Sequence, residues 1–321
     1  MLELDVSVER RELVVEVALE VHPGERVALF GPSGAGKTTV LETVAGFVAP
    51  RSGSVRLAGR TLVSAAPPRD TVPVWLRRVG LMRQEPALFP HLDVAGNLAY
   101  ARAGGGSDPG ARAAIAERLG IDGLLGAWPA ALSGGQARRV ALGRVLLADV
   151  DALLLDEPYA GLDARLRREV TEAVSSVVAA RGIPAVLVAH ELAEAQAFAD
   201  RLGILDMGRL LQTGTPHEVV ARPVSRRVAE LVGYAAFVPA ADRGTIGVHP
   251  ARVVTGARPD EGVVITGALR AVRASGARFE ADLDVHGVTV TCELRDPPAG
   301  VEVEVTVLDP PRFAPDGSAR R

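Results

Sequence analysis

The first thirty residues alternate between apolar and polar positions. Apolar side chains occupy every second position from Leu13 to Val21. A period of two is typical of a β-strand with one buried face. His22-Pro23-Gly24 then turns the chain, and a short apolar run ends at Phe30. The segment therefore predicts antiparallel strands that lead into a further strand.

Two later runs are apolar without alternation, at residues 152–155 and 184–189. Short strands of this kind are typical of a buried, parallel sheet. Between them, Ala164 to Arg181 has the charges and caps of a helix, and residues 94–130 also have a helical pattern. Strands that alternate with helices predict an α/β domain with a mainly parallel sheet, an antiparallel part and a helical part.

The pattern changes after Gly233. Strand-like runs dominate from Gly262 onward, with a period of two over residues 279–285, 288–294 and 301–307. Half-buried strands at this spacing predict a small β-barrel. We therefore expect two domains, residues 1–233 and 234–321, with a frayed tail from about residue 314.

Charge and cysteine content exclude several classes of protein. The net charge of −3 gives no general attraction to nucleic acid. The single cysteine, Cys292, excludes an internal disulfide framework and is typical of a reducing compartment. No apolar run of 18 residues occurs, and the first residues show no signal peptide. We expect a cytoplasmic protein that does not itself span a membrane.

The only lysine of the chain lies in a glycine-rich segment after Phe30. The segment reads Gly31-Pro32-Ser33-Gly34-Ala35-Gly36-Lys37-Thr38, and Thr39 opens a helix-like stretch. It matches G-x-x-x-x-G-K-[ST], in which backbone amides and a helix dipole converge on phosphates. A compact ammonium fits such a cradle better than a planar guanidinium. We predict a nucleotide-phosphate site; a glycine-rich turn with a solvated lysine is the alternative.

Polar side chains follow three apolar stretches. Asp156 suits Mg²⁺, directly or through water, and Glu157 suits the orientation or activation of an attacking water. Two solvated acids are the alternative. Gln84 can reach Mg²⁺ or that water, and His190 is a candidate γ-phosphate sensor, although a lone histidine there is more often structural. Because ligands bind at the carboxyl ends of strands in α/β folds, we expect these groups to converge.

A second anion site is predicted at Leu132-Ser133-Gly134-Gly135-Gln136. A helical run follows as far as Leu147, so the two glycines would expose amides at a helix N-terminus. Three arginines on that run, Arg138, Arg139 and Arg144, favour an anion site over a flexible linker.

These motifs, in this order, resemble the ATPase subunit of ATP-binding-cassette (ABC) transporters over residues 1–230. Gly161-Leu162-Asp163 completes the set. The resemblance implies a P-loop NTPase cassette that binds ATP and Mg²⁺ and hydrolyses ATP. It also implies that the phosphate loop of one copy faces the Ser-Gly-Gly-Gln element of a second, so that a homodimer encloses two ATP molecules.

The resemblance assigns a role to each motif residue. The expected catalytic residues are Lys37, Gln84, Glu157 and His190. The expected Mg²⁺ ligands are Thr38, Gln84 and Asp156. The expected nucleotide contacts are Gly31, Pro32, Ser33, Gly34, Ala35, Gly36, Lys37, Thr38, Thr39, Ser133, Gly134, Gly135, Gln136 and Asp163.

Two positions depart from the family pattern. The family stacks an aromatic residue of the N-terminal strands on adenine, but no Tyr, Trp or Phe precedes residue 30. Arg10 or Arg11 could stack there instead, or both could be solvated. The usual Thr-His-Asp around the histidine reads Ala189-His190-Glu191. Neither change removes a catalytic group.

The C-terminal part resembles the OB-like regulatory barrel of importer ATPases (the transport-associated OB type), with Gly247 to Val253 similar to a common stretch of that module. This favours an importer over an exporter. DNA-repair ABC ATPases carry long coiled-coil insertions, whereas Ser133 follows Lys37 by only 96 residues. Translation-type ABC factors normally carry two cassettes, and one is present here.

The expected partners are a second copy of the chain, membrane permease subunits and, indirectly, a solute-binding protein, at the cytoplasmic face of the cell membrane; no nucleic acid is expected. Residues Glu85 to His91 resemble importer sequences that form a groove for the permease, and ordinary packing is the alternative.

The expected solute is an inorganic ion, namely molybdate, tungstate, sulfate or ferric iron, with a polyamine or a sugar as alternatives. We expect the barrel to be regulatory or to support the dimer; the alternative is that it only stabilises the fold.

Overall fold

The structure is a computed structural model that describes residues 1–10, 13–67, 69–100, 108–239, 244–275, 278–294, 298 and 302–320. The chain divides into two compact units, Met1–Pro216 and His217–Arg321, which are described separately. The domain boundary expected between residues 233 and 234 remains a prediction.

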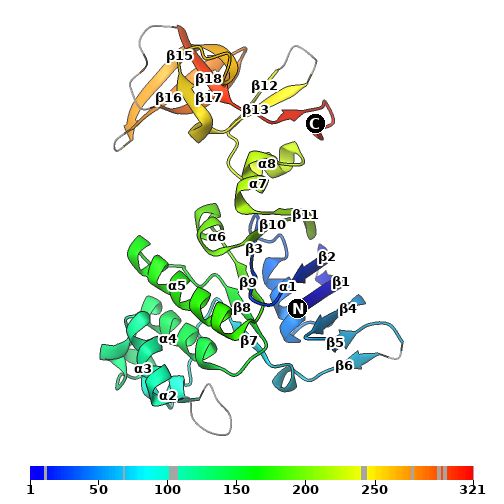
Figure 1. Ribbon diagram of the computed structural model, residues 1–321, viewed down its shortest axis with the longest axis vertical. Helices are drawn as coiled ribbons and strands as arrows, with labels where there is room; N and C mark the ends of the chain where they lie inside the picture. The colour runs from blue at the N-terminus through cyan, green and yellow to red at the C-terminus, as the bar shows by residue number, and fades with distance from the viewer. Residues whose placement is uncertain are drawn as a thin grey trace. The chain divides into compact units, whose positions relative to one another are not determined.

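One sheet of 11 strands forms the centre of the first unit, in the order β6-β5-β4-β1-β2-β11-β10-β3-β9-β8-β7 (Figure 1). Its strands are β1 (Leu2–Arg10), β2 (Leu13–Val21), β3 (Arg26–Phe30), β4 (Ser52–Leu57), β5 (Arg60–Ser64), β6 (Asp70–Thr71), β7 (Val79–Met82), β8 (Ala152–Asp156), β9 (Ala185–Val188), β10 (Arg201–Asp206) and β11 (Arg209–Gly214).

The two halves of this sheet differ in direction. The strands β10, β3, β9, β8 and β7 are parallel neighbours, whereas β1, β2, β4, β5 and β6 pair antiparallel. The difference follows from the sequence pattern. The β8 strand is buried at every position, as in a two-sided parallel sheet, whereas β2 alternates buried and exposed residues. The predicted α/β fold with an antiparallel part is confirmed.

The helices of the first unit include a separate helical part. They are α1 (Lys37–Ala45), α2 (Val94–Ala99), α3 (Pro109–Arg118), α4 (Gly134–Leu147), α5 (Ala164–Arg181) and α6 (Leu192–Phe198), with short 3-10 turns η1 (Val74–Leu76), η2 (Asp122–Leu124) and η3 (Pro129–Ala131). Figure 1 shows α2, α3 and α4 grouped on the side of the sheet where β7 lies, away from β4 to β6. Within the stretch 94–130, expected to be helical, residues 101–107 lie outside the described residues.

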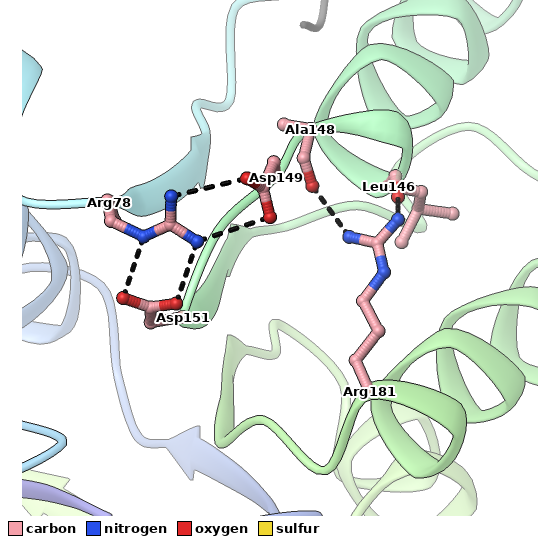
Figure 2. A network of polar contacts seen from close by, with 6 residues as sticks. All are labelled: Arg78, Leu146, Ala148, Asp149, Asp151 and Arg181. Carbon is pink, nitrogen blue, oxygen red and sulfur yellow. Dashed lines mark hydrogen bonds and ion pairs between the residues drawn. The ribbon is translucent and has the colours of Figure 1, made fainter. Parts of the chain in front are cut away.

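The connection from α4 to β8 is held from both sides by arginines (Figure 2). Arg78, just before β7, donates to both carboxylate oxygens of Asp151 and of Asp149. Arg181, at the end of α5, donates to the carbonyl oxygens of Leu146 and Ala148 at 2.8 and 2.6 Å. These contacts fix where α4 ends relative to β8, the strand that carries the predicted carboxylates.

The second unit consists of two short helices followed by antiparallel strands. It contains α7 (Pro216–Ala221), α8 (Arg226–Leu231), the 3-10 turn η4 (Pro250–Arg252), a sheet of β12 (Ala236–Pro239), β13 (Thr245–Val248), β19 (Arg312–Phe313) and β20 (Ala319–Arg320), and a sheet of β14 (Val253–Thr255), β18 (Glu302–Leu308), β15 (Gly262–Ser275), β16 (Arg278–Val285) and β17 (Val288–Leu294). The prediction of a small OB-like β unit is confirmed as a fold class.

Alternation again explains which face is buried. Ala281, Leu283 and Val285 of β16 pack in the core with Val290 and Cys292 of β17. The acidic residues between them lie on the outer face, where arginines pair with them. The segment from residue 314, expected to fray, instead turns and pairs through β20 with β19. No helix among the described residues is long and apolar enough to cross a membrane.

Candidate functional site

The phosphate-loop motif forms the connection between β3 and α1, as its sequence predicts. Gly36 caps the helix with φ 103°, a left-handed conformation that favours glycine. Gly31 has no room for a side chain, because an added Cβ would lie 1.8 Å from the carbonyl oxygen of Leu205 on β10. The two glycines therefore let the loop lie against the neighbouring strand and turn directly into α1.

Lys37, at the first position of α1, is the buried cation of this loop. Its Nζ donates to the carbonyl oxygens of Gly31 and Pro32 at 2.7 and 2.9 Å, and the residue is 8% exposed. Burial lowers the pKa of the ammonium, and the carboxylates of Glu157 and Asp156 oppose that shift. The loop therefore holds a positive charge beside exposed helix N-terminal amides, which is the electrostatic arrangement that an anion requires.

Asp156 lies at the carboxyl end of β8 and faces Thr38. The Thr38 hydroxyl donates to Asp156 Oδ1 at 3.3 Å, and Asp156 is only 5% exposed. Burial raises the pKa of this carboxyl group, and the hydrogen bond from Thr38 acts in the opposite direction. A buried carboxylate beside a hydroxyl is a hard oxygen donor set of the kind that Mg²⁺ prefers, so these residues fit the predicted metal.

Glu157 follows directly and is held in an unusual conformation. Its φ is 49°, in the left-handed region that is uncommon for residues other than glycine. Its backbone amide donates to the carbonyl of Val188 on β9, and its side chain accepts a hydrogen bond from Gln84 Nε2 at 3.0 Å. The two candidate catalytic residues are thus in direct contact, although they lie 73 residues apart in sequence.

The carboxyl ends of four neighbouring strands supply the candidate groups. In the order β3, β9, β8 and β7, these strands lead to Lys37, His190, Glu157 and Gln84. His190 is exposed, just after β9. All four residues therefore follow strand ends at one edge of the sheet, which is the edge where ligands bind in α/β folds.

The Ser-Gly-Gly-Gln element forms the start of α4. Ser133 accepts from the amide of Gln136 at 3.3 Å, and the Gln136 side chain accepts from the amide of Ser133 at 2.8 Å. In this reciprocal capping box the two polar side chains bond to each other's backbone amides. The two glycines of the first turn have no side chains, so they do not cover the end of the helix. Asp163 has a local role of the same kind, since its carboxylate caps α5 through the amide of Leu166 at 2.9 Å.

Three interactions near α1 were not predicted from the sequence. Glu42 on α1 pairs with Arg10 at 2.5 Å and with Arg83 at 3.1 Å, and the Arg83 guanidinium lies over the exposed ring of Phe47. Arg10, a candidate for stacking on adenine, is therefore bonded to a carboxylate. The other candidate, Arg11, lies outside the described residues. No sequence signal marks these contacts, because the partners come from separate elements.

Comparison with known proteins supports the cassette. Residues 14–160 match the model of the ABC transporter family. Among curated relatives, the sulfate/thiosulfate import ATP-binding protein CysA 2 of Chromobacterium violaceum is 41% identical over 232 residues, which are 71% of this chain and 62% of that protein. The Fe(3+) ions import ATP-binding protein FbpC of Pseudomonas fluorescens is 41% identical over 231 residues, 71% of this chain and 64% of that protein. The chain thus spans less than two thirds of the length of these relatives.

Solved structures agree with the fold. The ATP-binding subunit of an ABC transporter superposes with a TM-score of 0.59 at 27% identity, over 72% of this chain and 94% of that one. The dimeric ATP-binding cassette MJ0796, in a post-hydrolysis state with ADP and Pi, superposes with a TM-score of 0.57 at 25% identity, over 67% of this chain and 99% of that one. Fold, order of motifs and these similarities together show that the first unit has the fold of an ABC-type ATP-binding cassette.

Proposed function

We propose that this chain is the ATP-hydrolysing subunit of an import system and that it works as a homodimer at the cytoplasmic face of the cell membrane. The observation that carries the proposal is the contact between Gln84 and Glu157, beside the contact between Thr38 and Asp156, at one edge of the sheet. A phosphate-binding loop explains nucleotide binding, whereas a paired carboxylate and amide next to it also provide for hydrolysis.

In this proposal the phosphates of ATP lie on the loop amides and the N-terminus of α1. The Lys37 ammonium leaves the loop carbonyls for the more strongly charged phosphate oxygens. Thr38, Asp156 and Gln84 would hold Mg²⁺, which would neutralise charge on those oxygens. Glu157 orients the attacking water and accepts its proton, Gln84 holds the Glu157 carboxylate in place, and His190 contacts the γ-phosphate.

The second anion site is assigned to a second copy of the chain. The first turn of α4 presents backbone amides that have no intrahelical partner, and its glycines allow a phosphate to approach closely. A homodimer in which each α4 faces the phosphate loop of the other copy would use both anion sites. The dimeric cassette among the similar solved structures supports this arrangement.

We further propose that the system imports an inorganic ion. The relatives named for sulfate or thiosulfate and for Fe(3+) ions support this choice over a polyamine or a sugar. Membrane permease subunits and, indirectly, a solute-binding protein would be the other partners, and the second unit would have a regulatory or dimer-supporting role. A DNA-repair ATPase is disfavoured, because the described α-helices from Lys37 to Ser133 are only 6 to 10 residues long.

The test of ATP hydrolysis uses Glu157→Gln. We expect this variant to bind ATP with unchanged affinity and to hydrolyse it more slowly by about a hundredfold or more, because the carboxylate that orients the water is lost. In size-exclusion chromatography with Mg·ATP it should run as a dimer. Lys37→Ala and Lys37→Arg serve as controls that should lose nucleotide binding or hydrolysis. A Glu157→Gln protein that binds ATP but stays monomeric would contradict the enclosed dimer, and wild-type turnover in Lys37→Arg would contradict the phosphate cradle.

A further inference from the structure

The three arginines of α4 donate to backbone carbonyls of neighbouring loops. Arg139 donates to Leu119 and Gly120 at 2.8 and 2.9 Å, at the end of α3. Arg144 donates to Ala87 at 2.9 Å, and its guanidinium lies 5.0 Å from the centre of the Phe89 ring. The sequence pattern suggested that these side chains would support an anion site, but their donors are directed at neighbouring loops of the same chain.

Arg138 differs from the other two in what it holds. One guanidinium nitrogen donates to the carbonyl of Ala160 and the other to the carbonyl of Gln84, at 2.5 and 3.4 Å. Ala160 follows Glu157 by three residues, and its own amide donates to the Glu157 carbonyl at 3.4 Å. Gln84 is the residue whose side chain holds the Glu157 carboxylate. Arg138 therefore contacts the backbone on both sides of the candidate catalytic pair.

The placement of Arg138 is specific. The Arg138 Nε is buried and has no hydrogen-bond partner among the described residues. The two terminal nitrogens of the guanidinium therefore make its hydrogen bonds, one to each carbonyl. A planar guanidinium can reach two acceptors at once with fixed geometry, which a single ammonium does not reproduce. The side chain also begins one helical turn after the Gly134-Gly135 amides, on the same rigid helix.

We propose that Arg138 is a positioning residue that transmits the position of α4 to Gln84 and Glu157. The inference rests on the proposed function. Occupation of the α4 N-terminus by the ATP of a second copy would fix α4, and Arg138 would then fix the two loops that carry the water-orienting groups. Hydrolysis at one site would thereby depend on nucleotide at the other. In this proposal Arg138 acts through the carbonyls of Ala160 and Gln84 and not on the nucleotide.

The first test compares Arg138→Ala with two controls in steady-state ATP hydrolysis. We expect kcat to fall about tenfold, the scale of energetic coupling through such contacts, while KM and nucleotide affinity stay within about twofold. Arg118→Ala, an exposed arginine on α3, should match the wild type. Arg139→Ala removes two carbonyl contacts from the same helix and reports what general loosening of α4 does to thermal stability. Arg138→Lys should recover part of the rate, because one donor group remains.

The second test places Arg138→Ala in the Glu157→Gln background. If Arg138 acts through Glu157, the double variant should still form the Mg·ATP dimer and should hydrolyse ATP no more slowly than Glu157→Gln alone in single-turnover experiments. An unchanged kcat in Arg138→Ala would overturn the inference. So would a loss of dimerisation in the double variant, or a drop in kcat no larger than that of Arg139→Ala at equal thermal stability. A Glu157→Gln protein that never dimerises would instead count against the proposed function.

Discussion

The cassette and the second unit offer a comparison between two kinds of arginine contact. In the cassette, arginines such as Arg77, Arg138 and Arg181 donate to backbone carbonyls where separate elements meet. In the second unit, Arg270 and Arg273 pair with carboxylates on the neighbouring strand of the outer sheet face. Carbonyl contacts fix the position of a segment, whereas cross-strand ion pairs mainly offset the charge of the acids.

The aspartates show the same contrast. Burial raises the pKa of Asp156 in the cassette. Hydrogen bonds from Thr291 and Arg273 lower the pKa of Asp282 in the second unit, and a hydrogen bond from Arg270 lowers that of Asp284. A charged group that opposes folding is expected at a functional site, and a charged group that favours folding is expected on a stabilising surface. The contrast therefore separates a buried carboxylate at the candidate site from paired surface carboxylates of the second unit.

Each unit carries its own natural reporter, so the contrast can be measured unit by unit. Both tryptophans, Trp75 and Trp128, lie in the cassette, and the single cysteine, Cys292, lies fully buried in the core of the second unit. Tryptophan fluorescence in urea reports unfolding of the first unit. The rate at which a thiol reagent labels Cys292 reports opening of the second.

The largest effect is expected for Arg77→Met. Arg77 is 3% exposed and donates to the carbonyls of Val72, Thr43 and Val44 at 2.9 to 3.1 Å. Methionine would remove three buried hydrogen bonds, and of the three carbonyls only that of Thr43 would keep another donor among the described residues, the Gly46 amide. The cassette should therefore lose about 2–4 kcal/mol of unfolding free energy. The urea midpoint by tryptophan fluorescence should fall, whereas Cys292 labelling should not change. Arg69→Met, at an exposed arginine nearby, is the control; an equal effect there would refute the assigned role of the carbonyl contacts.

A smaller effect of opposite sign is expected for Asp156→Asn. The folded pKa of Asp156 lies above its unfolded value, so ionisation begins to destabilise the fold as the pH rises past the unfolded pKa, and the full destabilisation is present above the folded pKa. Asparagine should therefore stabilise the cassette at pH 7.5 by about 0.5–2 kcal/mol while abolishing hydrolysis. The gain should shrink as the pH falls and vanish below the unfolded pKa, where both side chains are neutral. Urea midpoints by tryptophan fluorescence across this pH range check the sign, and a gain that grows on acidification would contradict it.

The smallest effect is expected for Arg273→Ala. Arg273 is exposed and pairs with Asp282 at 2.5 Å and Glu280 at 3.9 Å. Because exposed pairs contribute little, the second unit should lose less than about 1 kcal/mol. The lowered pKa of Asp282 adds stability that is present above its unfolded pKa and lost as the pH falls through the folded pKa. Because Arg273→Ala removes part of that stability, the rate of Cys292 labelling should rise less on acidification than it does in the wild type. A loss as large as that of Arg77→Met would erase the contrast between the units.

Much of the cassette could be predicted from the sequence, because each predicted group follows a strand. The apolar runs located β8 and β9, and the helix expected at Ala164 to Arg181 is α5 with the same bounds. Placing Lys37 and Glu157 at one edge then required only that parallel strands end together. Their local motifs carried the remaining information.

The arginine contacts could not be predicted in this way. Any residue offers a backbone carbonyl, so nothing in the sequence marks Ala160 as the acceptor for Arg138, or Thr43 as an acceptor for Arg77. The pairing of Arg10 with Glu42 joins residues 32 positions apart on separate elements, and no sequence pattern predicts it either. Such contacts depend on how helices and strands pack against one another. A pattern of apolar positions does not give that information.

The candidate groups follow the ends of β3, β9, β8 and β7, and this arrangement limits where residues can be inserted or deleted. Asp156 is the last residue of β8, and because side chains alternate along a strand, one extra residue within β8 would turn a neighbouring position, not Asp156, toward Thr38 or would shift the pairing of the strand. The same residue added after α4, before the strand begins, would leave the pairing of β8 with β7 intact. Length variation among natural relatives should therefore be confined to the connections, while the strands that end at this edge keep a constant count of residues.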